Sequence, residues 1–377
     1  MSIFHLTVFE FFVWLRERIV KLLRGWLWRG EPSCNGGSCL VRWSTVCSPK
    51  CFGGLGVLDL DKFGRALRLR WERLCWTQPS KPWTCVATPL NDLDLSVFAA
   101  ATSITVRDGR FANFWHDAWL FGQRPMDIAP DLFKIARRKN RNVRSARWQF
   151  RWVSDIAHGV TPLNLGQFTR LFSMLDNAPP LAPGSDSIRW NLTSDGTYSA
   201  KSAYLAQFHG LTRVPFDRFF WRVWAPEKCR FFGWLLALQR VPTADFLERR
   251  GIPNDKRCPF CHTVEESAVH ILLDCSFARD IWSLIASRYD YPLLSPLSWV
   301  DTSSIRSWWS DRSDASQALG KTRAKAMAST ILLTFWETWK ERIGAFFSTS
   351  ISDHLRFSPS LRRKGLFGSR LAPVLES

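Results

Sequence analysis

The sequence is short of acidic residues and of long apolar runs, and both shortages limit the classes of function open to it. Of its 377 residues, 33 are Asp or Glu and 51 are Lys or Arg, which gives a formal net charge of +18 at pH 7. Such an excess of positive charge predicts attraction to a polyanion, either a nucleic acid or an acidic membrane surface. The most apolar stretch, residues 3–15, contains His5 and Glu10 and is too short to cross a bilayer. Since no basic region precedes it, we expect no signal peptide, no membrane partner, and a nuclear or cytoplasmic protein.

Nucleotide-binding fingerprints are also missing. The chain contains no G-x-G-x-x-G, and the Gly-Gly-Leu-Gly element at 53–56 is not followed by the Gly-Lys-Ser/Thr of a phosphate loop. Ten cysteines without a signal peptide are expected to be reduced thiols or metal ligands and not disulfides. Four of these cysteines could form a metal site, although their spacing is irregular: Cys34, Cys39, Cys47 and Cys51.

Four residues in the last third of the chain have the spacing of a zinc site. Cys258, Cys261, His270 and Cys275 are arranged as C-x2-C-x8-H-x4-C. Zinc takes sulfur and nitrogen ligands at the corners of a tetrahedron, and a Cys-x2-Cys turn supplies two of them while the next element supplies the other two. Five residues at 100° each separate His270 from Cys275 in angle, so we expect a helix over 265–273 with Cys275 just past its end. Four protein ligands leave no position for water, which makes a structural zinc ion (Zn2+) the expected cofactor.

Two other uses of these cysteines have to be weighed. His262 directly follows Cys261, so chemistry alone does not decide between His262 and His270 as the fourth ligand, and Cys-x-x-Cys-His is also a c-type haem attachment sequence. Haem attachment would leave His270 and Cys275 without a role. A thioredoxin-like redox pair needs a strand before its first cysteine, whereas residues 249–253 are typical of a helix end and a loop.

Positive charge is concentrated between residues 134 and 151. Trp148 and Phe150 interrupt the run, and arginine with interleaved aromatics can hold phosphates while stacking bases. The alternatives are a solvated basic loop or a nuclear-import signal. The candidate nucleic-acid residues are Lys134, Arg137, Arg138, Lys139, Arg141, Arg144 and Arg147, with Arg151 completing the run.

The hydrophobic pattern predicts mostly helices and a few short strands. A strand is expected over 40–46, and hairpins over 102–120, turning at Asp108-Gly109, and over 188–199, turning at Ser194-Asp-Gly196. The Pro-, Gly- and Ser-rich stretch 177–187 is the clearest linker. Helices are expected over 9–23, 59–76, 199–210, 216–224, 229–238, 243–250, 276–288 and 324–347.

The order of several motifs is familiar. They include Asp195-Gly-Thr-Tyr-Ser199, Phe220-Trp-Arg-Val-Trp-Ala-Pro-Glu-Lys228, Phe231-Phe-Gly-Trp234, Thr243-Ala-Asp-Phe-Leu247, Arg249-Arg-Gly251 and Glu266-Ser-Ala-Val-His270, with Trp282 after the last cysteine. In combination they resemble the zinc-binding domain at the C-terminal end of reverse transcriptases from plant LINE-type (non-LTR) retrotransposons. Upstream segments at 27–30, 41–43, 47–50, 53–56 and 109–119 resemble the stretch that joins the polymerase to this domain, so the resemblance covers roughly residues 20–347.

The resemblance implies that Cys258, Cys261, His270 and Cys275 are the metal ligands and that the chain is not an enzyme. The polymerase of such elements holds two magnesium ions on an Asp-Asp pair, and this sequence contains no Asp-Asp. Where the family has Trp-Lys-Glu-Arg-Asn, this chain has Trp339-Lys-Glu-Arg-Ile343, which indicates drift.

The expected fold class is α+β, mainly α: a helical zinc-binding domain with small β-hairpins, preceded by a short α/β remnant of the polymerase C-terminal region. The expected divisions are a polymerase remnant at 1–95, a hairpin with the basic connecting region at 96–180, the zinc-binding domain at 188–290, a helical extension at 291–348 and a loose basic tail at 349–377. We expect a non-catalytic protein that binds RNA or DNA electrostatically. The alternatives are an aromatic-rich protein-interaction module and a degenerate transposon fragment without activity.

Overall fold

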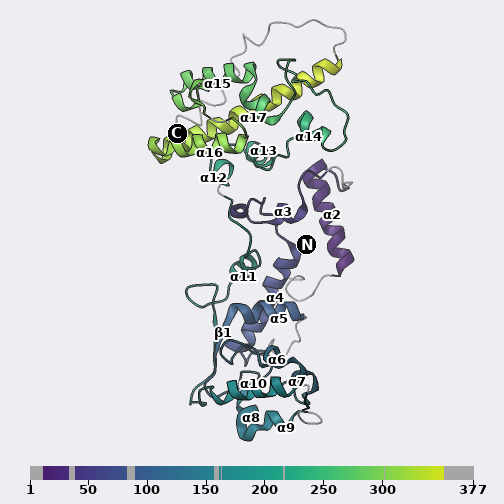
Figure 1. Cartoon of the computed structure of the whole chain (residues 1–377), viewed down its shortest axis with the longest axis vertical. Coiled ribbons are helices and arrows are strands. Elements are labelled where there is room, and N and C mark those ends of the chain that lie inside the picture. Colours follow the sequence, from purple (N-terminus) through teal and green to yellow (C-terminus); the bar gives the residue numbers. More distant parts are fainter. Residues whose placement is uncertain are drawn as a thin grey trace. The chain divides into compact units, whose positions relative to one another are not determined.

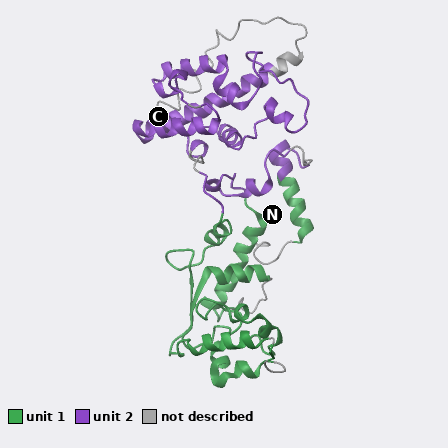
Figure 2. Cartoon of the chain, viewed as in Figure 1, with its two compact units in different colours: residues 1–23, 58–210 green, residues 24–57, 211–377 purple. Residues whose placement is uncertain are grey.

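The computed structural model describes residues 12–33, 39–82, 90–156, 161–162, 164–214, 217–300 and 302–351. The chain forms two compact units, each built from two stretches of sequence (Figure 2). Unit 1 comprises residues 1–23 and 58–210, and unit 2 comprises residues 24–57 and 211–377. Helix α2 (Val13–Arg29) contributes residues to both units.

Unit 1 is a group of short helices with one small sheet (Figure 1). Asp59 caps α4 by accepting hydrogen bonds from the N–H groups of Asp61 and Lys62, and Asn91 caps α5 in the same way. Asp94 is fully buried in this unit and is paired with Arg65 and Arg68 of α4. The helices are α4 (Leu60–Thr77), α5 (Asp92–Ala101), α6 (Pro125–Ile128), α7 (Pro130–Ile135), α8 (Val143–Arg147), α9 (Arg151–Ser154), α10 (Leu165–Asp176) and α11 (Ala200–Ala206).

The two strands pair with each other and not within two local hairpins, so both hairpin predictions were wrong. Strand β1 (Thr102–Thr105) lies antiparallel to β2 (Ser187–Trp190). The carboxylate of Asp186 accepts hydrogen bonds from the backbone N–H groups of residues 107, 109, 111 and 112. Burial would raise the pKa of Asp186, but these N–H donors lower it. The loop after β1 therefore wraps around a carboxylate instead of returning as a strand.

Unit 2 is built around an aromatic core. Trp234, Trp282, Trp308, Trp309 and Phe335 are each less than 2% exposed. Its helices are α3 (Trp43–Cys47), α12 (Asp217–Trp221), α13 (Glu227–Ala237), α14 (Ala244–Glu248), α15 (Ser276–Arg288), α16 (Ile305–Ala315) and α17 (Lys321–Ile351).

Helix α3 replaces the strand predicted over 40–46. The backbone turns sharply at Gly53, whose φ of 79° is in the left-handed region that glycine tolerates. After this turn, the N–H groups of Leu55 and Val57 both donate to the carbonyl of Val46 in α3. The indole of Trp234 donates to the carbonyl of Gly53 at 2.9 Å, which holds the turn against α13.

The expected fold class, α+β and mainly α, is confirmed, with a single two-stranded sheet in the described part of the chain. The domain boundaries predicted from the sequence stay predictions. Most of the expected basic tail lies outside the described residues, as do residues 1–11. Within the described ranges, no helix has both the length and the apolar character that crossing a bilayer would require.

A half-buried carboxylate in unit 1 leads to a prediction about pH. Burial raises the pKa of Asp117 to about 7, although the N–H of Asn113 donates to it at 2.6 Å and opposes the shift. Because the folded state holds this proton more tightly than the unfolded state, stability should fall as pH rises from about 4 to 7. Asp117→Asn should therefore raise the unfolding free energy by about 1–2 kcal/mol at pH 8 and by much less at pH 5.

Urea unfolding of both proteins at the two pH values measures this effect. Asp176→Asn is a matched control, because Asp176 is an exposed carboxylate at the end of α10 in the same unit. An equal response of the two variants at pH 8 would contradict the prediction.

Candidate metal centre

A small turn positions the first two cysteines. Arg257 and Glu265 form an antiparallel bridge that closes the loop at its base. Inside it, the N–H of Cys258 donates to the carbonyl of Val264 at 2.8 Å, and the N–H of His262 donates back to the carbonyl of Cys258 at 2.9 Å. His262 has a φ of 56° and is exposed, so the turn directs it to solvent.

The next element supplies the other two residues. A helix spans 268–274, and its second part, His270–Asp274, is a π-helical turn. Cys275 follows directly, with its N–H donating to the carbonyl of His270 at 2.7 Å, five residues back. The prediction that Cys275 lies just past the helix end is confirmed. The predicted start at 265 was wrong, because Glu265 belongs to the bridge with Arg257.

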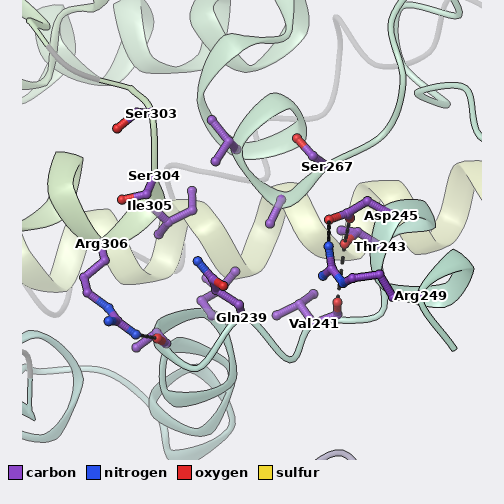
Figure 3. Close-up of a pocket in the computed structure, with 14 residues that line it drawn as sticks. Gln239, Val241, Thr243, Asp245, Arg249, Ser267, Ser303, Ser304, Ile305 and Arg306 are labelled. Carbon is purple, nitrogen blue, oxygen red and sulfur yellow. Dashed lines mark hydrogen bonds and ion pairs between the residues drawn. The ribbon is translucent and has the colours of Figure 1, made fainter.

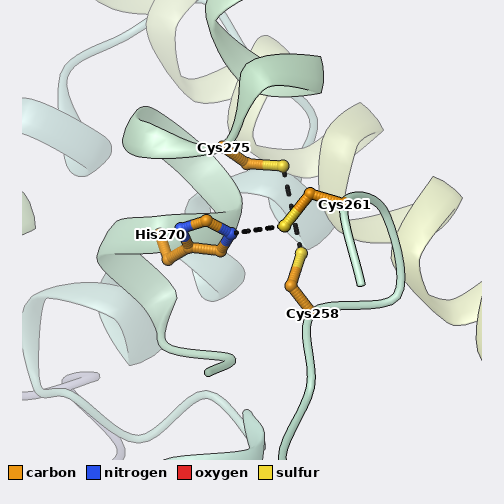
Figure 4. A group of neighbouring side chains, drawn as sticks. All are labelled: Cys258, Cys261, His270 and Cys275. Carbon is orange, nitrogen blue, oxygen red and sulfur yellow. Dashed lines mark hydrogen bonds between the residues drawn. The ribbon is translucent and has the colours of Figure 1, made fainter. Parts of the chain in front are cut away.

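The four side chains converge on one point (Figure 4). Their ligand atoms all lie within 4.8 Å of one another. The Sγ atoms of Cys258 and Cys275 are 3.9 Å apart, and Cys261 Sγ is 3.3 Å from His270 Nε2. A zinc tetrahedron with ligand bonds of about 2.0–2.3 Å places its ligand atoms roughly 3.5–3.8 Å apart. The three sulfurs and one imidazole therefore fit a tetrahedral metal ion of this size.

Backbone donors surround the sulfurs. The N–H groups two and three residues after each cysteine are directed at its Sγ: Phe260 and Cys261 at Cys258, Thr263 and Val264 at Cys261, and Phe277 and Ala278 at Cys275. Such donors stabilise thiolates, and a metal ligand has to be a thiolate.

The pKa values of the three thiols reflect this arrangement. The hydrogen bond between Cys258 and Cys275 raises the pKa of Cys258 and lowers that of Cys275 to about 7, because the two sulfurs share a proton. Burial acts to raise the pKa of Cys261, but hydrogen bonds from Thr263, Val264 and His270 lower it to about 7. The cluster is thus arranged to hold negative sulfur near neutral pH.

Two supporting residues, Glu266 and Trp282, belong to the sequence motifs, but the sequence did not indicate a role for either. Glu266 is 3% exposed and accepts hydrogen bonds from the N–H of Ala244 at 3.0 Å and from Nη2 of Arg342 at 2.7 Å. Through these two bonds, Glu266 connects the end of the cysteine-bearing turn to the start of α14 and to α17. Trp282 donates its indole N–H to the carbonyl of Leu272 at 2.8 Å, within the π-helical turn. A charged residue four positions before a ligand histidine was the available signal for Glu266.

His270, and not His262, joins the three cysteines. The short contacts pair Cys258 with Cys275 and Cys261 with His270, which gives all four residues a common role. Among the described residues, no further group of three or more His, Cys, Asp or Glu could hold a metal ion. Cys34, one of the four in the irregular cysteine set, lies outside the described residues.

A cavity of about 170 Å³ is lined by residues 267–269, which directly precede His270, and by the end of α13 and the start of α16 (Figure 3). Asp245 accepts from Thr243 at 2.5 Å and from Arg249 at 3.0 Å, while Arg306 donates to the carbonyl of Ala237. These charged groups therefore already pair within the wall of the cavity.

The basic segment belongs to unit 1 and divides into two groups. Arg141 forms a two-point pair with Asp155 at 2.6 and 2.8 Å, and Arg147 donates to the carbonyls of Ala178 and Pro179. Lys134 is exposed and pairs with Asp131. The remaining candidates, Arg137, Arg138, Lys139 and Arg144, are exposed, and no ion pair engages them within the described ranges. The structure thus gives Arg141 and Arg147 a structural task and leaves the other group at the surface.

Comparisons with known proteins agree with this geometry. Residues 198–282 match the family described as zinc-binding in reverse transcriptase, and this range contains all four candidate ligands. The chain is also 27% identical over 391 residues to an Arabidopsis thaliana protein named "Putative ribonuclease H protein At1g65750". That similarity covers 90% of this chain but 58% of the relative, so the chain spans little more than half of the relative's length. No solved structure matches the chain significantly.

Proposed function

Given a reverse-transcriptase type of zinc-binding segment, we propose that this chain is a non-catalytic, zinc-stabilised protein derived from a plant LINE-type retrotransposon. It binds RNA or DNA electrostatically through its basic segment, in the nucleus or the cytoplasm. The observation that carries the zinc assignment is the convergence of three sulfurs and one imidazole nitrogen within 4.8 Å, inside the matched range 198–282.

The zinc ion would have a structural role. Cys258 and Cys275 are fully buried in the main core cluster of unit 2, and His270 is 9% exposed. Four protein ligands complete the tetrahedron, so no position remains for a water or a substrate. Held there, the ion would fix the 258–264 turn to the helix that precedes α15. The chain itself has no Asp-Asp pair with which to bind catalytic magnesium.

The exposed cations of the basic segment support nucleic-acid binding. Between residues 134 and 151 there are eight Lys or Arg residues and no Asp or Glu. Two carboxylates form ion pairs with this segment: Asp155 pairs with Arg141, and Asp131 pairs with Lys134. The exposed guanidinium groups of Arg137, Arg138 and Arg144 are therefore available to phosphates.

A protein-interaction module remains the second candidate. It rests on the exposed aromatics, such as Trp26 at 60% and Trp148 at 58%. Seven other tryptophans are less than 2% exposed, however, which places them in the core and not on a docking face. A docking function predicts a partner that stays bound at high salt, whereas phosphate contacts weaken steeply with salt.

Replacing Arg137, Arg138, Lys139 and Arg144 with alanine should reduce the salt dependence of binding. Each phosphate contact contributes about 0.7–0.9 to the slope of log affinity against log salt, so the slope should fall by about 3. Fluorescence anisotropy with a labelled oligonucleotide at several salt concentrations measures this change. Arg141 is left in place because its loss would unpair the buried Asp155.

The matched control removes the same four charges elsewhere. Lys201, Arg213, Arg222 and Arg240 are exposed cations outside the basic segment. The control should keep nearly the full slope. Equal losses in both variants would mean that binding reflects net charge only and would remove the basic segment as the interface.

A further inference from the structure

The turn between α8 and α9 holds two consecutive residues in a costly conformation. Gln149 has φ 48° and ψ 36°, and Phe150 has φ 54° and ψ 33°. Both lie in the left-handed region, which costs a non-glycine residue roughly 1 kcal/mol or more. The two aromatic side chains of this turn are not buried: Trp148 is 58% exposed and Phe150 is 55% exposed. The strained turn displays its aromatic side chains.

Phe150 is the outermost ring of an aromatic series that begins in the core of unit 1. Phe114 and Trp152 are buried and lie 6.0 Å apart with an interplanar angle of 25°. Trp152 to Phe168, Phe168 to Phe172 and Phe172 to Phe150 follow at 5.4, 5.9 and 5.6 Å, with angles of 31°, 27° and 18°. A series of near-parallel rings thus runs from the core of unit 1 to Phe150 at the surface. A further flat group could stack on Phe150 and extend this series.

Exposed cations lie on the two helices that flank this turn. Arg144 lies on α8 and Arg151 on α9, directly before and after the turn, and both are exposed. Asp155 connects the rest of the basic segment to α9, because its carbonyl accepts the N–H of Arg137 and its carboxylate pairs with Arg141. No carboxylate is paired with Arg137, Arg144 or Arg151 in the described part of the chain.

From this juxtaposition we infer that the Trp148–Phe150 turn is a stacking platform for the bases of a single-stranded nucleic acid, with phosphates held by Arg137, Arg138, Arg144 and Arg151. The inference rests on the proposed function and adds the class of ligand to it. In single strands a base is free to stack on an aromatic ring, whereas in a duplex both faces of each base are already covered. Exposed aromatics also suit a protein partner, but four exposed arginines that form no ion pair within the described ranges favour a polyanion.

The test replaces both aromatics, as Trp148→Ala with Phe150→Ala. We expect at least a tenfold loss of affinity for a 20-nucleotide oligo(dT) or oligo(U), since each stacked base is worth about 1–3 kcal/mol. Affinity for a 20-base-pair duplex and for heparin should be unchanged, and so should the salt slope for the single strand. Phe111→Ala with Phe121→Ala is the matched control, because both are exposed phenylalanines of unit 1. Trp148→Phe with Phe150→Tyr should restore single-strand affinity to within about threefold of the wild type if stacking is the cause.

The possible results distinguish a failure of the stacking platform from a failure of the proposed electrostatic binding. An unchanged single-strand affinity in the double variant overturns the platform, while the salt-dependent binding of the wild type would leave the proposed function intact and would favour a protein partner for the aromatics. Equal losses for single strand, duplex and heparin also overturn it, because stacking acts on bases alone. A wild-type protein that binds none of the three overturns both.

Discussion

Removal of the metal is expected to unfold unit 2 while unit 1 stays folded. Structural zinc contributes on the order of 10 kcal/mol or more in small modules, which is comparable with the whole stability of a domain at about 5–15 kcal/mol. Without a cation, three sulfurs remain gathered within 4.8 Å of one another around no positive charge. Cys258 and Cys275 are part of the main core cluster of unit 2, so their separation would open that core. None of the four candidate ligands belongs to unit 1.

Metal analysis of the purified chain should first find one zinc per molecule. Circular dichroism during titration with a chelator should then show a partial loss of helix, and hydrogen exchange should assign the loss to unit 2. Cys275→Ser should reproduce the effect, whereas Cys75→Ser, at an exposed position on α4, should not. A chain without zinc, or with an unchanged spectrum after chelation, would identify the four ligands as relics of a degenerate fragment.

Arg342→Met is expected to destabilise unit 2 by about 3–5 kcal/mol, because it leaves the carboxylate of Glu266 buried and without its guanidinium partner. The two side chains are 10% and 3% exposed and 2.7 Å apart. Glu266→Gln should cost less, since an amide oxygen can still accept the N–H of Ala244. In the double variant the uncompensated charge is gone, so its cost should be smaller than the sum of the two single costs.

Urea unfolding followed by Trp fluorescence measures these free energies. The control is Glu337→Gln, which breaks the pair with Lys340 on the same helix, where both side chains are more than a third exposed. Surface pairs of this kind contribute about 0–1 kcal/mol. Additive costs for Glu266→Gln and Arg342→Met would show that the two residues do not act as a pair.

Local patterns were sufficient for much of the fold. The spacing C-x2-C-x8-H-x4-C identified the four side chains that converge in the structure. The helix expected over 276–288 matches α15 at both ends. Helix α4 begins one residue after its capping residue Asp59. In these cases the determining contacts are made within a few residues of sequence, which is the range over which periodicity and capping signals operate.

The errors arise where a distant residue determines the local structure. The hairpin expected at 102–120 does not form because Asp186 binds the N–H groups of the presumed turn. Nothing near Arg141 in sequence distinguishes it from Arg138, yet Asp155 makes the first structural and leaves the second at the surface. Glu266 gains its role through Arg342, which lies 76 residues later in the sequence, and no local pattern predicts that pair.

The interrupted course of unit 2 has a consequence for its synthesis. A ribosome produces residues 24–57 first, then all of residues 58–210, and only afterwards α13, whose Trp234 donates its indole N–H to the carbonyl of Gly53. The early stretch must therefore wait, with Val41 and Val46 of the core exposed, until the later stretch emerges. A fragment cut to the matched range 198–282 would lack both this stretch and the aromatic residues of α16 and α17. Expression of the zinc segment alone should thus yield an incomplete core, and both flanks have to be kept in any shortened version of the chain.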